Sequence, residues 1–285
     1  MAIKNILVPF ASAASGPHVL EAAIALGDRF KSHVCTLHVR PDPTALIPYI
    51  VGPMPSDMLV QISENAEKQG RERAAQAQAK FKEICDKSSA GKAKTKAGAG
   101  VLWCEEVGNV DYAYGIAARL SDLAILPQPE TMGPDSLVDI LESVLFRSGR
   151  PVLMLPSKAP VAPGKRIVVA WNGSIEATRA LAAAMPFLEA AEDVIILTIG
   201  EDLAEGPGGD AVKDYLGLHK IKARTVKAAE STGGEGAGLL AKADELKADM
   251  IVMGAYRHSR LREFILGGVT QHVIDHAEIA VLLLH

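Results

Sequence analysis

KNILVPF at residues 4–10 recurs 161 residues later as KRIVVAW at residues 165–171. A second pair, SDLAILP at residues 121–127 and ADMIVMG at residues 248–254, is offset by only 127 residues. The two offsets differ by 34 residues, so the sequence predicts a tandem repeat whose first copy carries extra chain. We place that extra chain in the polar, helix-favouring stretch of residues 53–94, which has no counterpart in the second copy.

Within each copy, short apolar runs alternate with helical stretches. The runs are rich in Val, Ile and Leu throughout, which is typical of strands buried on both faces of a parallel sheet. We expect strands at 4–9, 33–39, 100–106, 122–126 and 151–155, and again at 166–171, 193–199, 222–228, 249–254 and 279–284. We expect helices at 17–30, 57–87, 109–120, 135–147, 175–189, 208–217, 234–247 and 267–276.

The predicted fold class is therefore α/β, with two domains that each hold a five-stranded parallel sheet covered by helices on both faces. The segment SKAPVAPG at residues 157–164 contains two prolines and a glycine, which extend neither a strand nor a helix. We expect domains at 1–157 and 165–285, joined by a linker at 158–164.

Composition narrows the classes of function. The chain has 285 residues, of which 48% are apolar, and a formal charge of −4. Such a chain has material for packed cores but no basic excess for nucleic acid, so no nucleic-acid partner is predicted. Three cysteines at unrelated spacings suggest reduced thiols. We expect no charged leader and no membrane span, because the apolar runs are too short to cross a membrane. We expect a cytoplasmic protein with no membrane partner.

Parallel α/β sheets bind ligands at the carboxyl ends of their strands, where the winding direction reverses. In the second copy, Asn172-Gly173-Ser174 follows the first strand and Gly254 ends the fourth, followed by Arg257-His258-Ser259. Gly267-Gly268-Val269-Thr270 then opens the last helix. Glycines at a strand end and at a helix start suit a polyphosphate, because they admit close approach and expose backbone N–H groups. The alternative is that Gly254 only turns the chain and the glycine pair only makes a tight helix entry.

These motifs resemble those of the universal stress protein family. The family pattern places G-x-x-G, nine residues and then G-S or G-T before a final helix and strand. This chain has Gly254 at the start, Gly267 at the matching distance and an apolar closing strand at 279–284. Asn172-Gly173-Ser174 looks like the family's Asp-Gly-Ser. The resemblance implies two flavodoxin-like domains, of the adenine nucleotide alpha hydrolase-like type, and a role in a stress response, with ATP or another adenine nucleotide as a ligand and no metal.

Three positions depart from the family pattern. Arg257 replaces the second motif glycine, Gly268 replaces the serine or threonine, and Asn172 replaces the aspartate expected to hold the ribose. A neutral hydrogen bond contributes roughly 1 kcal/mol, against about 1.5–3 kcal/mol for one to a charged group, so weaker ribose binding is expected. The basic residues of segment 257–262 could compensate at the phosphates, or could instead pair with acidic groups of the other copy or of a partner.

The first copy differs from the family pattern at more positions than the second copy does. Ala11 stands at the aspartate position, and residues 127–134 lack the glycine spacing and include Glu130. We expect this copy to be a structural partner, so that any nucleotide sits in the second copy, one for each chain.

Other interpretations remain open. The fold could serve as a ligand-free dimerising scaffold or interaction module, because family members commonly pair through their last strands, here 151–155 and 279–284. Such pairing could join the two copies within one chain or form a homodimer. Separately, the apolar loop at 47–55 could bind a partner protein. A slow ATP hydrolase is a third function, without assigned catalytic residues. His272 and His276 have a spacing that suits a metal but no third ligand, so no metal is predicted.

Overall fold

The computed structural model describes residues 2–13, 16–43, 56–88, 100–129, 137–200, 206–229, 231–255 and 268–285. The N-terminal half contains β1 (Asn5–Pro9), α1 (Pro17–Phe30), β2 (His33–Pro41), α2 (Ser56–Lys87), β3 (Val101–Gly108), α3 (Val110–Ala118), β4 (Leu123–Pro127), α4 (Leu137–Arg147) and β5 (Val152–Leu155). The C-terminal half contains β6 (Arg166–Ala170), α5 (Ile175–Glu189), β7 (Asp193–Ile199), α6 (Gly209–Leu218), β8 (Ala223–Ala228), α7 (Glu235–Glu245), β9 (Met250–Gly254), α8 (Gly268–His276) and β10 (Ala280–Leu284).

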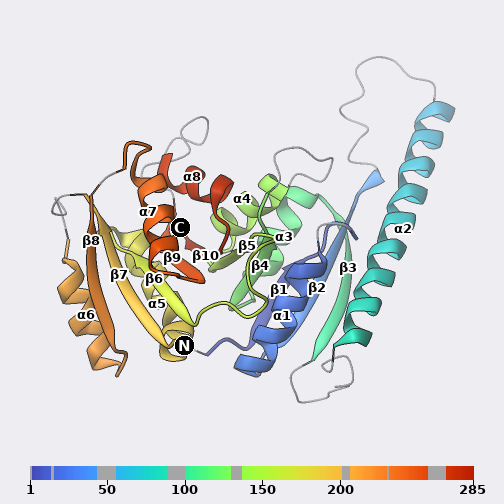
Figure 1. Ribbon diagram of the computed structural model, residues 1–285. Coiled ribbons are helices and arrows are strands. Elements are labelled where there is room, and N and C mark those ends of the chain that lie inside the picture. Colours follow the sequence, from blue (N-terminus) through green and yellow to red (C-terminus); the bar gives the residue numbers. More distant parts are fainter. Residues whose placement is uncertain are drawn as a thin grey trace.

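All ten strands form one continuous sheet in the order β3-β2-β1-β4-β5-β10-β9-β6-β7-β8. Pairing is parallel within each half, and β5 and β10 meet antiparallel in the middle, with Leu153 opposite Leu282. The predicted α/β class with parallel sheets is confirmed. Figure 1 shows α2 beyond β3 at one end of the sheet and α6 beyond β8 at the other.

Two hydrophobic cores lie on opposite faces of this sheet, and each runs through both halves. Helices α1, α2, α5 and α6 contribute to the first core, and α3, α4, α7 and α8 contribute to the second. The inner strands are apolar because both of their faces are covered: every residue of β4, β5 and β10 is buried.

The end strands differ from the prediction of fully buried runs. In β3, no residue is fully buried, and Leu102 is 57% exposed. The other end strand, β8, likewise has no fully buried residue. An end strand has a neighbour on one side only, so less of its surface is covered.

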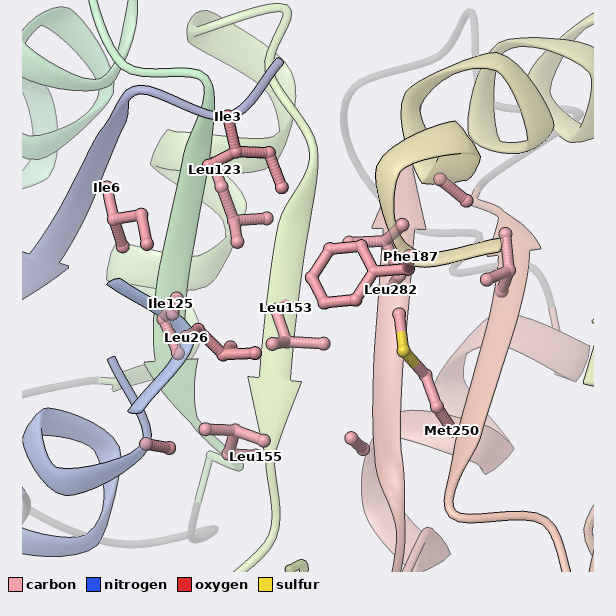
Figure 2. Packing of buried hydrophobic residues seen from close by; sticks show 14 of the residues in the cluster. Ile3, Ile6, Leu26, Leu123, Ile125, Leu153, Leu155, Phe187, Met250 and Leu282 are labelled. Carbon is pink, nitrogen blue, oxygen red and sulfur yellow. The ribbon is translucent and has the colours of Figure 1, made fainter. Parts of the chain in front are cut away.

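The junction between the halves packs around Phe187 of α5. Figure 2 shows its ring lying beside Leu153 of β5 and Leu282 of β10, the two strands that join the halves. The ring also meets Phe30 of α1 edge to face, with 5.0 Å between the centroids. Side chains from both halves therefore fill one apolar layer at the junction.

The linker is held at the same place. Arg29, in the last turn of α1, donates from its guanidinium to the carbonyl oxygens of Pro163, Gly164 and Ala190, at 3.0, 3.3 and 3.2 Å. These bonds fasten the end of α1 to the linker and to the end of α5.

We expect Arg29→Ala to lower the free energy of unfolding by about 1–3 kcal/mol, because hydrogen bonds to a charged donor are lost from three carbonyl groups. Urea denaturation measures the change. Arg29→Lys keeps the charge but loses the forked geometry, so it should recover only part of the loss. Equal stability of Arg29→Ala and the wild type would show that these bonds are not needed to join the halves.

In the described ranges, no helix combines the length and the apolar character that a membrane crossing demands.

Candidate functional site

The turn after β6 is built by its own polar side chains. The backbone N–H of Ser174 donates to Oδ1 of Asn172 at 3.1 Å, and Gly173 between them has a φ of +72°, which favours glycine. The Ser174 hydroxyl oxygen accepts from the N–H of Ala177 at 3.1 Å and so caps α5. Ser174 is thus buried and hydrogen-bonded, whereas Asn172 is exposed.

A second segment, residues 206–208, lies against this turn. The buried indole of Trp171 donates from Nε1 to the carbonyl oxygen of Pro207 at 2.7 Å. A Cβ atom placed on Gly206 would lie only 2.6 Å from the carbonyl oxygen of Gly173, so the two backbones are in close contact. This segment bounds one side of the candidate site. No spacing in the sequence marked it, because the contact joins residues 36 positions apart.

Gly254 has a packing role that the sequence did not suggest. A Cβ atom at this position would lie 2.5 Å from the backbone nitrogen of Ala177 and 2.6 Å from the carbonyl carbon of Glu176. The missing side chain therefore lets the end of β9 approach the first turn of α5. This close packing is enough to explain a glycine at position 254, without a phosphate contact or a turn.

The start of α8 has different surroundings. Gly268 is exposed, and a Cβ atom placed on it would meet no atom within 4 Å in the described part of the chain. The first turn of α8 contains no acidic residue, and Thr270 within it is buried. The first turn of α5, in contrast, contains Glu176. Since helix N-termini attract anions, α8 offers the more favourable start for a phosphate group.

The remaining predicted site residues, Arg257, His258, Ser259 and Gly267, lie outside the described residues. Val269 is half-buried in the first turn of α8. His272 and His276 stack on one another with 4.3 Å between their centroids. Within the described ranges, no group of three His, Cys, Asp or Glu side chains is arranged to hold a metal ion.

The corresponding strand ends of the N-terminal half carry different residues. Ala11 follows β1 where the other half has Asn172 and supplies no polar side-chain group. At the end of β4, the Gln128 side chain donates to the carbonyl oxygen of Ile274 in α8, at 2.7 Å, and so joins the two halves.

An aromatic cluster also occupies this part of the N-terminal half. Nδ1 of the buried His38 lies 2.8 Å from the carbonyl oxygen of Phe10, so this ring nitrogen donates. The imidazole stacks on Trp103 at 5.8 Å between centroids, and Trp103 in turn meets Phe81 of α2. In the C-terminal half, the backbone register places Thr198 where His38 stands, so this stack has no counterpart there.

Comparison with known proteins finds one family model that matches part of the chain and several solved structures with a similar fold. Residues 164–285 match the model of the universal stress protein family. The chain is similar over 98% of its length to the crystal structure of a universal stress protein from Archaeoglobus fulgidus DSM 4304, with 18% identity, 97% of that chain covered and a TM-score of 0.64. It is similar over 99% of its length to a structure from Pseudomonas aeruginosa UCBPP-PA14 assigned to the same proteins, with 15% identity, 93% of that chain covered and a TM-score of 0.55.

At these identities the structural likenesses establish the fold. Among curated proteins, nothing matches the chain.

Proposed function

We propose that this chain acts in a stress response as a tandem protein that binds one adenine nucleotide, in the C-terminal half alone, because residues 164–285 match the model of the universal stress protein family. The family supports the stress-response role. The nucleotide and its position rest on the residues at the carboxyl ends of β6 and β9.

The observation that carries the proposal is the contrast between the two halves at equivalent strand ends. The C-terminal half presents an exposed Asn172 and an α8 whose first turn has no acidic residue and whose Gly268 meets no described atom within 4 Å of an added Cβ. The N-terminal half has Ala11 at the first position and uses Gln128 to hold α8. We infer domains at residues 1–157 and 165–285, of which the first is a structural partner.

In this arrangement the Asn172 amide would donate to a ribose hydroxyl, and the backbone N–H groups at the start of α8 would receive phosphate oxygens. Gly173 and Ser174 would shape the turn, and Gly254 would set the distance between β9 and α5. The basic residues Arg257 and His258, together with Ser259, would complete the phosphate side by charge and hydrogen bonding.

Calorimetric titration of the purified full chain with ATP tests the proposal, together with chromatographic identification of any nucleotide released by acid. We expect one equivalent for each chain, and weaker binding in Arg257→Glu. Two equivalents would refute the restriction to one half. An absence of binding at millimolar ATP would refute nucleotide binding and leave the ligand-free scaffold, for which the β5–β10 pairing is the supporting observation.

Asn172→Asp should raise the affinity for ATP. A carboxylate can still accept from the N–H of Ser174, so the turn is preserved, and it offers a charged partner to the ribose hydroxyls. The difference between a charged and a neutral hydrogen bond predicts a gain of about threefold to tenfold.

Ala11→Asp, at the equivalent position of the N-terminal half, is the matched control and should leave the titration unchanged. An unchanged affinity in Asn172→Asp would contradict a ribose contact at this residue.

A further inference from the structure

Two of the three cysteines meet across the end of the sheet. Sγ of Cys35 in β2 lies 3.2 Å from Sγ of Cys104 in β3, and the Cys35 thiol donates to the Cys104 sulfur. The third, Cys85, lies on α2 in the core on the opposite face. All three are free thiols. We propose that Cys35 and Cys104 form a site of reversible oxidation, at which a hydroperoxide converts the thiol pair into a disulfide between β2 and β3.

The backbone register makes the two cysteines diagonal neighbours on one face of the sheet. Cys104 stands opposite Leu37, two residues along β2 from Cys35, so both thiols point to the same face of the sheet. A disulfide requires about 2.05 Å between the sulfurs, about 1 Å closer than they now lie. It also requires roughly 4.4–6.8 Å between the Cα atoms, whereas diagonal neighbours on adjacent strands stand roughly 7–8 Å apart, so the two strands must also shift locally. Among the described strands β3 is the last of the sheet and pairs only with β2, so it can make such a shift without breaking a described ladder on its other side.

An oxidant can reach this pair. Both Cys35 and Cys104 are half-buried, whereas Cys85 is buried. Their neighbours on the same face of β3 are open to solvent: Leu102 is 57% exposed and Glu106 is exposed. The site therefore admits a small hydroperoxide such as hydrogen peroxide.

The chemistry balances within the pair. One thiol, as its thiolate, attacks the peroxide oxygen and becomes a sulfenic acid, releasing one water after protonation. The second thiol attacks that sulfur and displaces a second water. In total, two thiols give up two electrons and two protons, and one hydrogen peroxide becomes two waters. Reduction by a small thiol reverses the bond by exchange.

The surroundings make this reaction slow. Burial, with smaller contributions from Cys104 and Glu106, raises the pKa of Cys35 to about 12. Its thiolate is therefore scarce at neutral pH, and thiolate is the reactive form. We expect a disulfide that accumulates over minutes to hours, as suits a modification that records exposure to oxidant rather than one that turns over.

Oxidation would join β2 and β3, the two strands that flank the extra segment of the N-terminal half, residues 53–94. The sulfurs belong to residues 69 positions apart, and the intervening chain includes all of α2. This helix packs on β2 and β3 from the other face. A disulfide would therefore restrict separation of β3 and α2 from the rest of the sheet.

The test treats the purified full chain with hydrogen peroxide, unfolds it, and alkylates the remaining thiols with iodoacetamide before intact-mass and peptide analysis. We expect the oxidised chain to carry one alkylated cysteine, Cys85, instead of three, and to yield a Cys35–Cys104 cross-linked peptide. Dithiothreitol should restore all three alkylation sites. Oxidation should also slow proteolysis within residues 56–88 at least several-fold.

Cys104→Ser should abolish both the cross-link and the protection, and Cys85→Ser, the matched control, should keep both. The peptide map of the wild type is decisive even where a variant folds poorly. Cross-links that involve Cys85, cross-links only between chains, or sulfinic acid at Cys35 or Cys104 without a bond between them would overturn the proposal, as would three alkylated cysteines after prolonged treatment.

Discussion

Gly254→Ala is expected to destabilise the protein by about 3 kcal/mol, with Gly254→Val more severe. The added Cβ would lie 2.5 Å from the nitrogen of Ala177 and 2.6 Å from the carbonyl carbon of Glu176. Both are backbone atoms of the first turn of α5, so no side-chain rotation relieves the collision. Helix α5 packs on β9 and β10, and moving it would also disturb Phe187 at its other end.

Urea denaturation followed by circular dichroism measures this effect. Gly268→Ala is the matched control, because a Cβ there meets no described atom within 4 Å. It should leave stability unchanged or slightly improved, since alanine favours a helix more than glycine does. A Gly254→Ala protein with the wild-type midpoint would contradict the close approach of β9 and α5. Loss of ATP binding in a Gly254 variant therefore says little about a phosphate contact unless its fold has been verified.

Phe187→Ala is expected to lower the free energy of unfolding by about 3–5 kcal/mol, the usual range for removing a buried phenylalanine ring. Phe187 is fully buried, and its ring packs beside Leu153 of β5 and Leu282 of β10, as Figure 2 shows. The resulting cavity would weaken the β5–β10 junction, and both halves should become less stable together.

The two tryptophans make this prediction measurable, because Trp103 lies in the N-terminal half and Trp171 in the C-terminal half. Fluorescence of the single-tryptophan variants Trp171→Phe and Trp103→Phe follows each half separately. With Phe187 in place, we expect the two single-tryptophan variants to share one denaturation midpoint. Adding Phe187→Ala to each should lower both midpoints. Phe146→Ala, at a ring that is 40% exposed, is the control and should cost under about 1 kcal/mol. Two well-separated midpoints in the wild-type background would contradict a shared core.

The sequence predicted the bounds of a helix closely where the spacing of its apolar residues and its capping residue indicated the same start. The helix expected at 175–189 occurs as α5 (Ile175–Glu189), because Ser174 provides a cap and the apolar positions recur at helical spacing. The helix expected at 234–247 ends at Glu245, two residues early. Helix ends depend on local hydrogen bonds that periodicity does not encode.

Contacts between distant residues were less accessible to sequence reasoning. The sequences of β3 and β8 contain charged residues such as Glu105 and Lys227, unlike the apolar inner strands, and the prediction of fully buried runs overlooked this sign of an end strand. The role of Gly254 depends on how close α5 lies, and the Trp171–Pro207 bond depends on the path of a loop. The polar turn at Asn172–Ser174 was found because its residues are adjacent in the chain.

The antiparallel junction of β5 and β10 affects which amino-acid substitutions the protein can tolerate during evolution. In a symmetric homodimer, one altered codon alters both subunits, so a position that binds ligand in one must be kept in the other. Here the partners share a single polypeptide and are encoded separately. The corresponding strand ends can therefore carry different residues, such as Asn172 and Ala11, while β5 and β10 remain paired.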